Sequence, residues 1–475
     1  MFLNGLYALL LILASPWIAW RVITQGRYRR GWKCKLFGVG PAAALALTNN
    51  AANAADSGDA TDSGDATDSG DATDSGDATN SGDRGSIGNT PESDAADGRP
   101  AVWWLHAVSV GEVNLLPTLV QRLEDQVPDA VFVISTSTDT GFDLAVQHFG
   151  SDRVFFAPLD FTWAVRRTCR NLRCKRLILA ELELWPNLIT AAKSGGARVS
   201  VINARMSPRS GRRYRKFRFL LGGTFGRLDQ VGCQDTATRD AFIDCGADRG
   251  ASVVTGSIKF DNAPTDRCAA EVLRHGRWAG VAAWHRVWVL GSSGEGEESM
   301  VLDIFAKVRK HHPELRLIIV PRHAPRFDDV AKLIEAAEFR CARVSRVADA
   351  SEDWPGDRVI LVDTIGQLRD WWGLAHIATV GGTFIDRGGQ NMIEPAGYGA
   401  ALCFGPDTRN FALIARLMEQ ADAAVRVADA AALESFVRRC LDDPAATQSL
   451  SLAAKRWVQT HQGALEKTVR LLLEN

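Results

Sequence analysis

The chain has 475 residues, more than a single hydrophobic core usually organises, so at least two domains are expected. Its composition, with 46% hydrophobic and 23% charged residues, is that of a globular protein, and the net charge of −1 gives no general electrostatic attraction to nucleic acid. The nine cysteines, an odd number without a CxxC pair, indicate reduced, mostly buried thiols in a cytosolic protein and argue against a metal site built on cysteine.

The chain begins with an apolar segment. Residues 2–23 carry no charge before Arg21, and about 20 apolar residues can span a bilayer as a helix. Basic residues follow this segment and none precedes it, so the positive-inside rule places the N-terminus outside and the rest of the chain in the cytoplasm. A cleaved signal peptide is the alternative, because the small residues from Ala44 to Ala55 resemble a cleavage region, but the segment lacks a basic start. We therefore expect an uncleaved, single-pass transmembrane anchor over residues 1–24.

A low-complexity segment follows the anchor. The hexapeptide DSGDAT occurs four times from Asp56 to Thr79, within a stretch over 50–98 that has almost nothing apolar to bury. The repeat matches neither the EF-hand loop nor the RTX nonapeptide, so a solvated spacer is favoured over a calcium site. We expect residues 25–98 to form a basic juxtamembrane segment and a disordered acidic linker.

From Val102 onward, short apolar runs alternate with helical patterns, which is typical of parallel sheets covered by helices on both faces. The alternation of strand and helix patterns is interrupted near 262–285, so we expect two Rossmann-like domains, at 99–265 and 266–475. A helix over 444–474 is expected to pack back across the junction between them. In such sheets ligands bind at the carboxyl ends of the strands. Strands are expected at 102–107, 130–135, 153–157, 176–180, 199–203, 252–255, 286–290, 315–320, 358–362, 376–380 and 400–404.

Several polar loops of the first domain follow a predicted strand. Glu112 comes after the first strand, in HAVSVGE, where a carboxylate could act as a general base. Taken from spacing alone, a role in complementing the helix dipole is the simpler interpretation. The hydroxyl-rich loop 135–141 could hold a polar ligand or cap the next helix. Two carboxylates precede a Trp-Pro corner in 181–187, and the basic run 209–216 suits either a solvated helix face or acidic head groups.

The stretch 380–406 carries the strongest pattern in the second domain. It contains two glycine pairs and then a helix expected to begin near Asn391, which would direct free N–H groups and a positive helix end at a phosphate. Glu394 would lie one turn into this helix, where it could accept hydrogen bonds from ribose hydroxyls. The alternative is two β-turns and an N-cap. Arg322 follows the strand 315–320 and could hold a phosphate with both guanidinium nitrogens. Because these loops fall at the same sheet edge, together they favour an active cleft.

Taken together, the motifs resemble the 3-deoxy-D-manno-octulosonic acid (Kdo) transferases of lipopolysaccharide synthesis. The resemblance runs from the N-terminal segment to about residue 420, with the acidic repeat as an interruption. Its ordered matches are HAVSVGE at 106–112, ELELWPN at 181–187, NARMS at 203–207, TGSIKFD at 255–261, GEE at 296–298, VPRH at 320–323, DTIGQL at 363–368, and VGGTF, GGQNMIEP and FGP within 380–406.

This resemblance implies a GT-B fold, with two Rossmann-like domains facing a cleft, and an inverting transfer from CMP-Kdo to a lipid A precursor. The reaction would take place at the cytoplasmic face of the inner membrane, in contact with its lipids, with no cofactor, no metal and no nucleic acid partner. Glu112 would be the catalytic base. The residues that would bind the donor CMP-Kdo are Arg322, His323, Gly366, Gly382, Asn391 and Glu394. Those on the acceptor side of the cleft would be Ser109, Gly111, Glu183, Asn203 and Arg205.

The sequence departs from the family pattern at two positions. Gln390 and Gly294 stand where the family usually carries histidine, so neither position can offer a cation near phosphate. Two alternatives therefore stay open: a related GT-B transferase with another donor or acceptor, and a non-catalytic, membrane-tethered scaffold.

Overall fold

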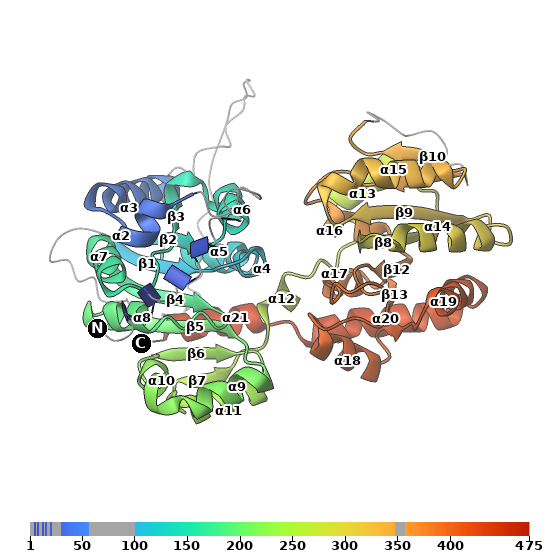
Figure 1. Cartoon of the computed structure of the whole chain (residues 1–475). Helices are drawn as coiled ribbons and strands as arrows, with labels where there is room; N and C mark the ends of the chain where they lie inside the picture. The colour runs from blue at the N-terminus through green and yellow to red at the C-terminus, as the bar shows by residue number, and fades with distance from the viewer. Residues whose placement is uncertain are drawn as a thin grey trace, which may run out of the picture. The chain divides into compact units, whose positions relative to one another are not determined.

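The computed structural model describes residues 30–56, 100–346 and 357–474, together with a few positions between residues 4 and 20. These residues form two compact units (Figure 1). Unit 1 comprises Met1–Thr255 and Glu466–Asn475, and unit 2 comprises Gly256–Leu465. The division falls at Thr255, before the boundary expected at residue 265, and the end of the chain returns to unit 1.

Unit 1 contains a seven-stranded sheet in the order β3-β2-β1-β4-β5-β6-β7, in which every pairing is parallel. The strand order reverses between β1 and β4, so the loops that follow these two strands flank the point where such sheets bind ligands. The strands are β1 Ala101–His106, β2 Ala130–Thr136, β3 Val154–Phe156, β4 Cys174–Ala180, β5 Arg198–Ala204, β6 Gln230–Cys233 and β7 Ser252–Val254.

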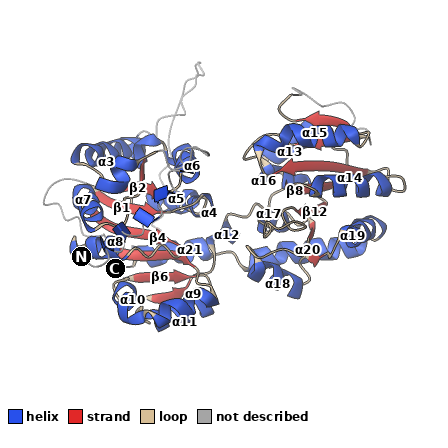
Figure 2. Cartoon of the chain, viewed as in Figure 1, coloured by secondary structure: helices blue, strands red, loops and turns tan. Residues whose placement is uncertain are grey.

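The sheet of unit 1 is buried because its strands are continuous apolar runs and helices cover them. From Val102 to Leu105 the side chains of β1 are at most 5% exposed. Figure 2 shows helices packed around these strands. The helices are α2 Trp32–Phe37, α3 Pro41–Asp56, α4 Val110–Val113, α5 Leu116–Gln126, α6 Asp139–Phe149, α7 Thr162–Leu172, α8 Pro186–Ser194, α9 Pro208–Lys216, α10 Arg218–Phe225, α11 Thr236–Cys245 and α21 Ala464–Leu473.

Helices α2 and α3 lie within residues 25–98, where a basic juxtamembrane segment and then a disordered acidic linker are expected. Ala44 and Leu47 of α3 are buried in the core of unit 1, and α3 packs against α7 and β2. The backbone N–H of Val39 donates to Thr168 Oγ1 at 3.0 Å, and Asn171 Nδ2 donates to the Val39 carbonyl at 2.7 Å. The small residues that resemble a cleavage region therefore form a docked helix. The DSGDAT repeat lies outside the described residues.

Unit 2 contains a second parallel sheet of seven strands, in the order β10-β11-β9-β8-β12-β13-β14. Here the order reverses between β8 and β12. Each strand expected from the sequence is present in the two sheets, whereas β6, β10 and β14 were not expected. The strands are β8 Arg286–Ser293, β9 Leu315–Pro321, β10 Arg340–Arg343, β11 Arg358–Leu361, β12 Ile377–Val380, β13 Ala401–Phe404 and β14 Val425–Arg426.

The helices of unit 2 cover its sheet in the same way, and its last helix leads the chain out of the unit. Instead of one helix over 444–474, the chain forms α20 and then α21, whose residues from Glu466 belong to unit 1. Gln230 Nε2 of β6 donates hydrogen bonds to the carbonyls of Leu471 and Glu474. The helices are α12 Ile258–Asp261, α13 Ala270–Ala279, α14 Glu297–Val308, α15 Phe327–Ala336, α16 Leu368–Trp371, α17 Ile393–Gly397, α18 Ala412–Gln420, α19 Ala430–Asp442 and α20 Pro444–Thr460.

The predicted membrane anchor over 1–24 lies mostly outside the described residues. In the part of the chain that is described, no helix combines the length and the apolar character needed to cross a bilayer. Two described positions near the N-terminus contact unit 1: Asn4 Oδ1 accepts from the Thr162 backbone N–H at 3.1 Å, and the Tyr7 hydroxyl donates to Asp160 Oδ2 at 3.0 Å.

Candidate active site

Glu112 lies at the carboxyl end of β1, in the single turn α4. Its Oε2 accepts a hydrogen bond from the Val108 backbone N–H at 2.7 Å, and its Oε1 accepts one from Ser109 Oγ at 3.1 Å. The hydroxyls of Thr136 and Thr138 donate to the Val108 carbonyl at 3.2 and 2.9 Å. The loop after β1 is therefore braced by the loop after β2, and both oxygens of the carboxylate are held in place.

The environment of Glu112 makes its carboxylate a stronger base than a free glutamate. Burial, together with the charges of Glu183 and Glu181, raises the pKa of Glu112 to about 7. The hydrogen bonds from Val108 and Ser109 oppose that shift. Because a general base works best with a pKa near the working pH, the site favours a base over a carboxylate that only complements the helix dipole.

The loop after β4 brings Glu183 close enough to influence Glu112 electrostatically. Since β1 and β4 are adjacent, the residues that follow them meet at the strand-order reversal. Trp185 Nε1 donates to Glu183 Oε2 at 2.8 Å, which fixes this side chain. Burial also raises the pKa of Glu183. The Trp-Pro corner thus positions a second carboxylate beside the candidate base.

The other candidate residues of unit 1 lie in the turn after β1 and at the end of β5. Ser109 is the N-cap of α4, and Gly111 is exposed in that turn. Asn203 is buried at the end of β5 with φ 51°, and its carbonyl accepts from Gln234 Nε2 at 3.0 Å. Arg205 follows it and is exposed. The hydroxyl-rich loop 135–141 caps α6, because Thr138 Oγ1 accepts from the Gly141 N–H.

In unit 2, a buried glutamate organises the first glycine pair of the 380–406 stretch. Glu297, with no exposed surface, accepts four backbone hydrogen bonds. They come from Gly294 at 2.8 Å, Gly382 at 2.7 Å, and Thr383 and Phe384 at 3.0 Å each. The carboxylate thereby joins the loop after β8 to the loop after β12, on the two sides of the strand-order reversal. It was not among the expected site residues, although GEE at 296–298 was one of the matched motifs.

The glycines here have specific steric roles. Gly382 has φ 68°, which a side chain would strain, and a Cβ on Gly381 would lie 2.6 Å from the Ser292 carbonyl oxygen. Gly388 and Gly389 both have φ 78°. The Gly389 N–H donates to the Gly382 carbonyl at 2.8 Å, so the two glycine pairs close one compact loop.

Asn391 and Glu394 follow this loop and are hydrogen bonded to each other. Asn391 Nδ2 donates to Glu394 Oε1 at 3.0 Å, and Asn391 Oδ1 accepts from the Ile393 N–H at 3.1 Å. The helix begins at Ile393, close to the expected start near Asn391, and the asparagine side chain forms the turn before it. Burial raises the pKa of Glu394, while the charges of Arg369 and Arg322 and the Asn391 hydrogen bond oppose this shift.

Basic side chains gather near the same strand ends. The Arg322 backbone N–H donates to the Ser293 carbonyl at 3.0 Å, which ties the end of β9 to the end of β8. Arg387 Nη1 lies 3.5 Å from His323 Nε2. Burial, together with the charges of Arg322 and Arg387, lowers the pKa of His323. The arrangement suits an anion. Gly366 lies apart, exposed in the loop after β11 with φ 88°.

Gly294 packs closely against the side chain of Ile385. A Cβ at this position would lie 2.3 Å from Ile385 Cδ1, so any larger residue requires Ile385 to move. Glycine at this position therefore goes together with an isoleucine that occupies the adjacent space.

A second buried glutamate supports the loop after β8. Glu298, with no exposed surface, accepts from Ser293 Oγ at 2.6 Å and pairs with both terminal nitrogens of Arg326, at 2.7 and 3.0 Å.

We expect Arg326→Ala to leave this carboxylate buried and unpaired and to destabilise the protein by about 3–5 kcal/mol, measured by denaturant unfolding. Arg340→Ala is the matched control, because its pair with Asp357 is exposed to solvent and should contribute little to stability. Equal losses in the two variants would contradict the prediction.

Two parallel-sheet α/β units, each with polar side chains at the carboxyl ends of strands beside its strand-order reversal, resemble the two domains of the GT-B fold. The same fold is found in HepE from Anabaena, crystallised with UDP and glucose, which matches with a TM-score of 0.51 at 13% identity over 78% of this chain and 99% of that chain.

The family model described as 3-deoxy-D-manno-octulosonic-acid transferase (kdotransferase) matches residues 83–262. The 3-deoxy-D-manno-octulosonic acid transferase of Bordetella pertussis is 34% identical over 377 residues, covering 78% of this chain and 86% of that protein. The enzyme of the same name from Haemophilus influenzae is 30% identical over the same shares. The chain therefore belongs to the Kdo transferase family.

Proposed function

We propose that this chain is an inverting glycosyltransferase that transfers Kdo from CMP-Kdo to a lipid A precursor in lipopolysaccharide synthesis. The observation that carries the proposal is Glu112, a fixed and partly buried carboxylate with a pKa of about 7 at the carboxyl end of β1. Glu112 takes the proton of an acceptor hydroxyl. The hydroxyl oxygen forms a bond to the anomeric carbon of Kdo as the bond from that carbon to the phosphate oxygen breaks, and CMP leaves.

We assign the donor to unit 2. Gly381 lets the loop after β12 pack closely against the backbone of the loop after β8, and Glu394 offers a carboxylate to ribose hydroxyls. Arg322 would meet the phosphate, and Arg387 adds positive charge near His323. This assignment also gives Glu297 a role, because its four hydrogen bonds join the loop after β8 to the loop after β12, which carries Gly382 and Arg387.

The experiment that tests this function uses the full chain, because α2 and α3 are part of the core of unit 1. Purified protein in detergent receives a tetraacylated lipid A precursor and CMP-Kdo generated in place, and the products are analysed by mass spectrometry. Mass gains of one or more Kdo units establish the reaction. Thermal protection by CMP and not by UDP supports the donor class. Protection by UDP without Kdo transfer would favour another GT-B transferase, and no protection by either nucleotide would favour the scaffold.

We further propose that the protein works at the cytoplasmic face of the inner membrane. Helices α9 and α10 present exposed basic side chains next to two exposed aromatic rings, Phe217 at 46% and Phe219 at 87% exposure. Basic residues beside exposed aromatic rings suit a surface of anionic lipid. The basic side chains are Arg209, Arg212, Arg213, Arg215, Lys216 and Arg218.

The role of the N-terminal segment can be tested separately. The contacts of Asn4 and Tyr7 with unit 1 support a segment lying in the membrane interface. Release of the protein by alkaline carbonate would agree with this arrangement, whereas retention in the membrane would establish the single-pass anchor.

We expect Phe219→Glu to weaken binding to vesicles that contain anionic phospholipid by about tenfold, because it removes an exposed ring and adds a repelled charge. The measurement is co-sedimentation at fixed ionic strength. Leu273→Glu is the matched control, an exposed apolar side chain on α13 of unit 2. Equal effects of the two substitutions would contradict the assignment of this surface.

A further inference from the structure

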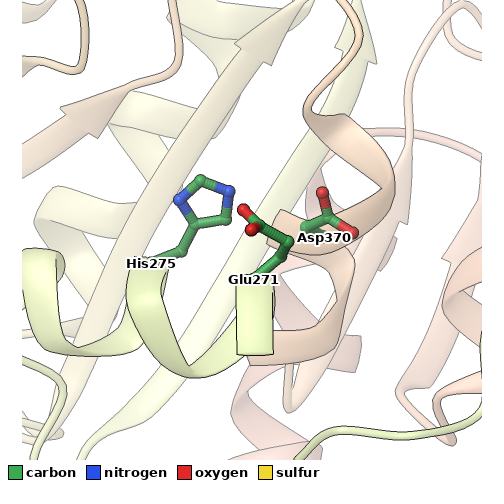
Figure 3. Close-up of side chains that lie close together, drawn as sticks. All are labelled: Glu271, His275 and Asp370. Atoms are coloured by element: carbon green, nitrogen blue, oxygen red, sulfur yellow. The ribbon is translucent and has the colours of Figure 1, made fainter. Parts of the chain in front are cut away.

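Three potential metal ligands meet where α13 packs against α16 in unit 2. Glu271 and His275 lie one turn apart on α13, and Asp370 comes from α16 (Figure 3). One ligand atom from each lies within 4.8 Å of the other two. Within the described residues this is the one such group of histidine, cysteine, aspartate and glutamate side chains. None of the three belongs to the proposed reaction.

His275 supplies an independent sign that a ligand belongs here. Its side chain is 6% exposed, and its Nε2 has no hydrogen-bond partner among the described residues. Figure 3 shows this nitrogen facing the Glu271 carboxylate. The imidazole ring of His275 stacks on the ring of Trp371, with centroids 4.5 Å apart and planes at 18°. A buried imidazole nitrogen without a partner is unfavourable, and a cation bound at this place would satisfy it.

We propose that His275, Glu271 and Asp370 bind a divalent transition-metal cation such as Zn²⁺. One imidazole and two carboxylates form a donor set that suits Zn²⁺ and its first-row neighbours, whereas Mg²⁺ and Ca²⁺ prefer oxygen ligands alone. A tetrahedral ion with bonds of about 2.0–2.1 Å needs ligand atoms roughly 3.4 Å apart, so the side chains close by about an ångström on binding. Glu271 is exposed and can make this movement.

The surrounding charges define how the cation is held. Arg274 pairs with Glu271 Oε2, so Oε1 is the oxygen offered to the ion. Three protein ligands leave one position for water, as in zinc sites that stay open to solvent. The ion would join α13 to α16. It would thereby hold in place the segment that runs from the end of β11 to α16. This role goes beyond glycosyl transfer, because it stabilises unit 2 without touching the reacting groups.

The test is calorimetric titration of Zn²⁺ into the full-length protein after treatment with a chelator, together with the melting temperature at each addition. We expect one equivalent to bind and to raise the melting temperature. Asp370→Asn and His275→Gln should each weaken the affinity at least tenfold. Asp303→Asn, an exposed carboxylate on α14, should leave it unchanged.

Two results would overturn the site. One is that no Zn²⁺ binds to the wild-type chain. The other is that Asp370→Asn and Glu271→Gln, both outside the buried core and expected to fold, bind Zn²⁺ as tightly as the wild type. These two variants keep the test decisive if His275→Gln is too unstable to purify.

Discussion

Glu112→Gln is expected to lower the rate of Kdo transfer by about 10²–10⁴-fold, because the amide keeps the shape of the side chain but cannot accept the proton of the acceptor hydroxyl. Binding of CMP, which we assign to unit 2, should be unchanged. The measurement combines product formation followed by mass spectrometry with calorimetric titration of CMP. Asp125→Asn, an exposed carboxylate on α5, is the matched control and should retain full activity. A Glu112→Gln enzyme that turns over normally would remove Glu112 from the mechanism.

The pH dependence provides a second readout for the same residue. Glu112 acts as a base only when deprotonated, so activity should fall about tenfold per pH unit below its pKa of about 7 and level off above it. The same shift affects stability. The folded-state pKa lies above the ordinary value of 4.5, so deprotonation costs stability as the pH rises from 4.5 through about 7. Glu112→Gln should therefore raise the melting temperature at pH 8 while it lowers activity, which simple misfolding could not do.

Glu297→Ala is expected to destabilise unit 2 by more than about 3 kcal/mol and to abolish CMP binding. The substitution leaves the backbone N–H groups of Gly294, Gly382, Thr383 and Phe384 without their acceptor, and each buried donor left unpaired costs about 1–3 kcal/mol. Denaturant unfolding and CMP titration provide the two measurements.

Two further variants separate this role from a general loss of charge. Glu295→Ala removes an exposed glutamate two residues away and should change neither stability nor CMP binding. Glu297→Gln keeps one acceptor oxygen, so it should lose less stability than Glu297→Ala. If all three variants bind CMP like the wild type, the carboxylate does not organise the donor loops.

Much of the architecture was predictable because buried parallel strands are continuous apolar runs, as in VWWL of β1 and LIIV of β9. The strands that escaped prediction lack this signal. β6 reads QVGC, β10 reads RCAR and β14 has only two residues. Gln230 is buried in β6 because its side-chain amide bonds to Ser200 and to the last helix, partners that are remote in the sequence. The docking of α2 and α3 was missed for the same reason, since α3 is buried by contacts with α7 and β2, which are remote in the sequence.

The sequence by itself determined the family, the two parallel sheets and the position of Glu112 after the first strand, because these depend on local runs and ordered motifs. Only the tertiary structure decided how these residues act. The pKa of Glu112 is raised by burial and by Glu183 from a neighbouring strand. Three of the four hydrogen bonds of Glu297, and the meeting of His275 with Asp370, join segments distant in the chain. Burial, charge and hydrogen bonding act between atoms close in space, and the fold alone brings these atoms together.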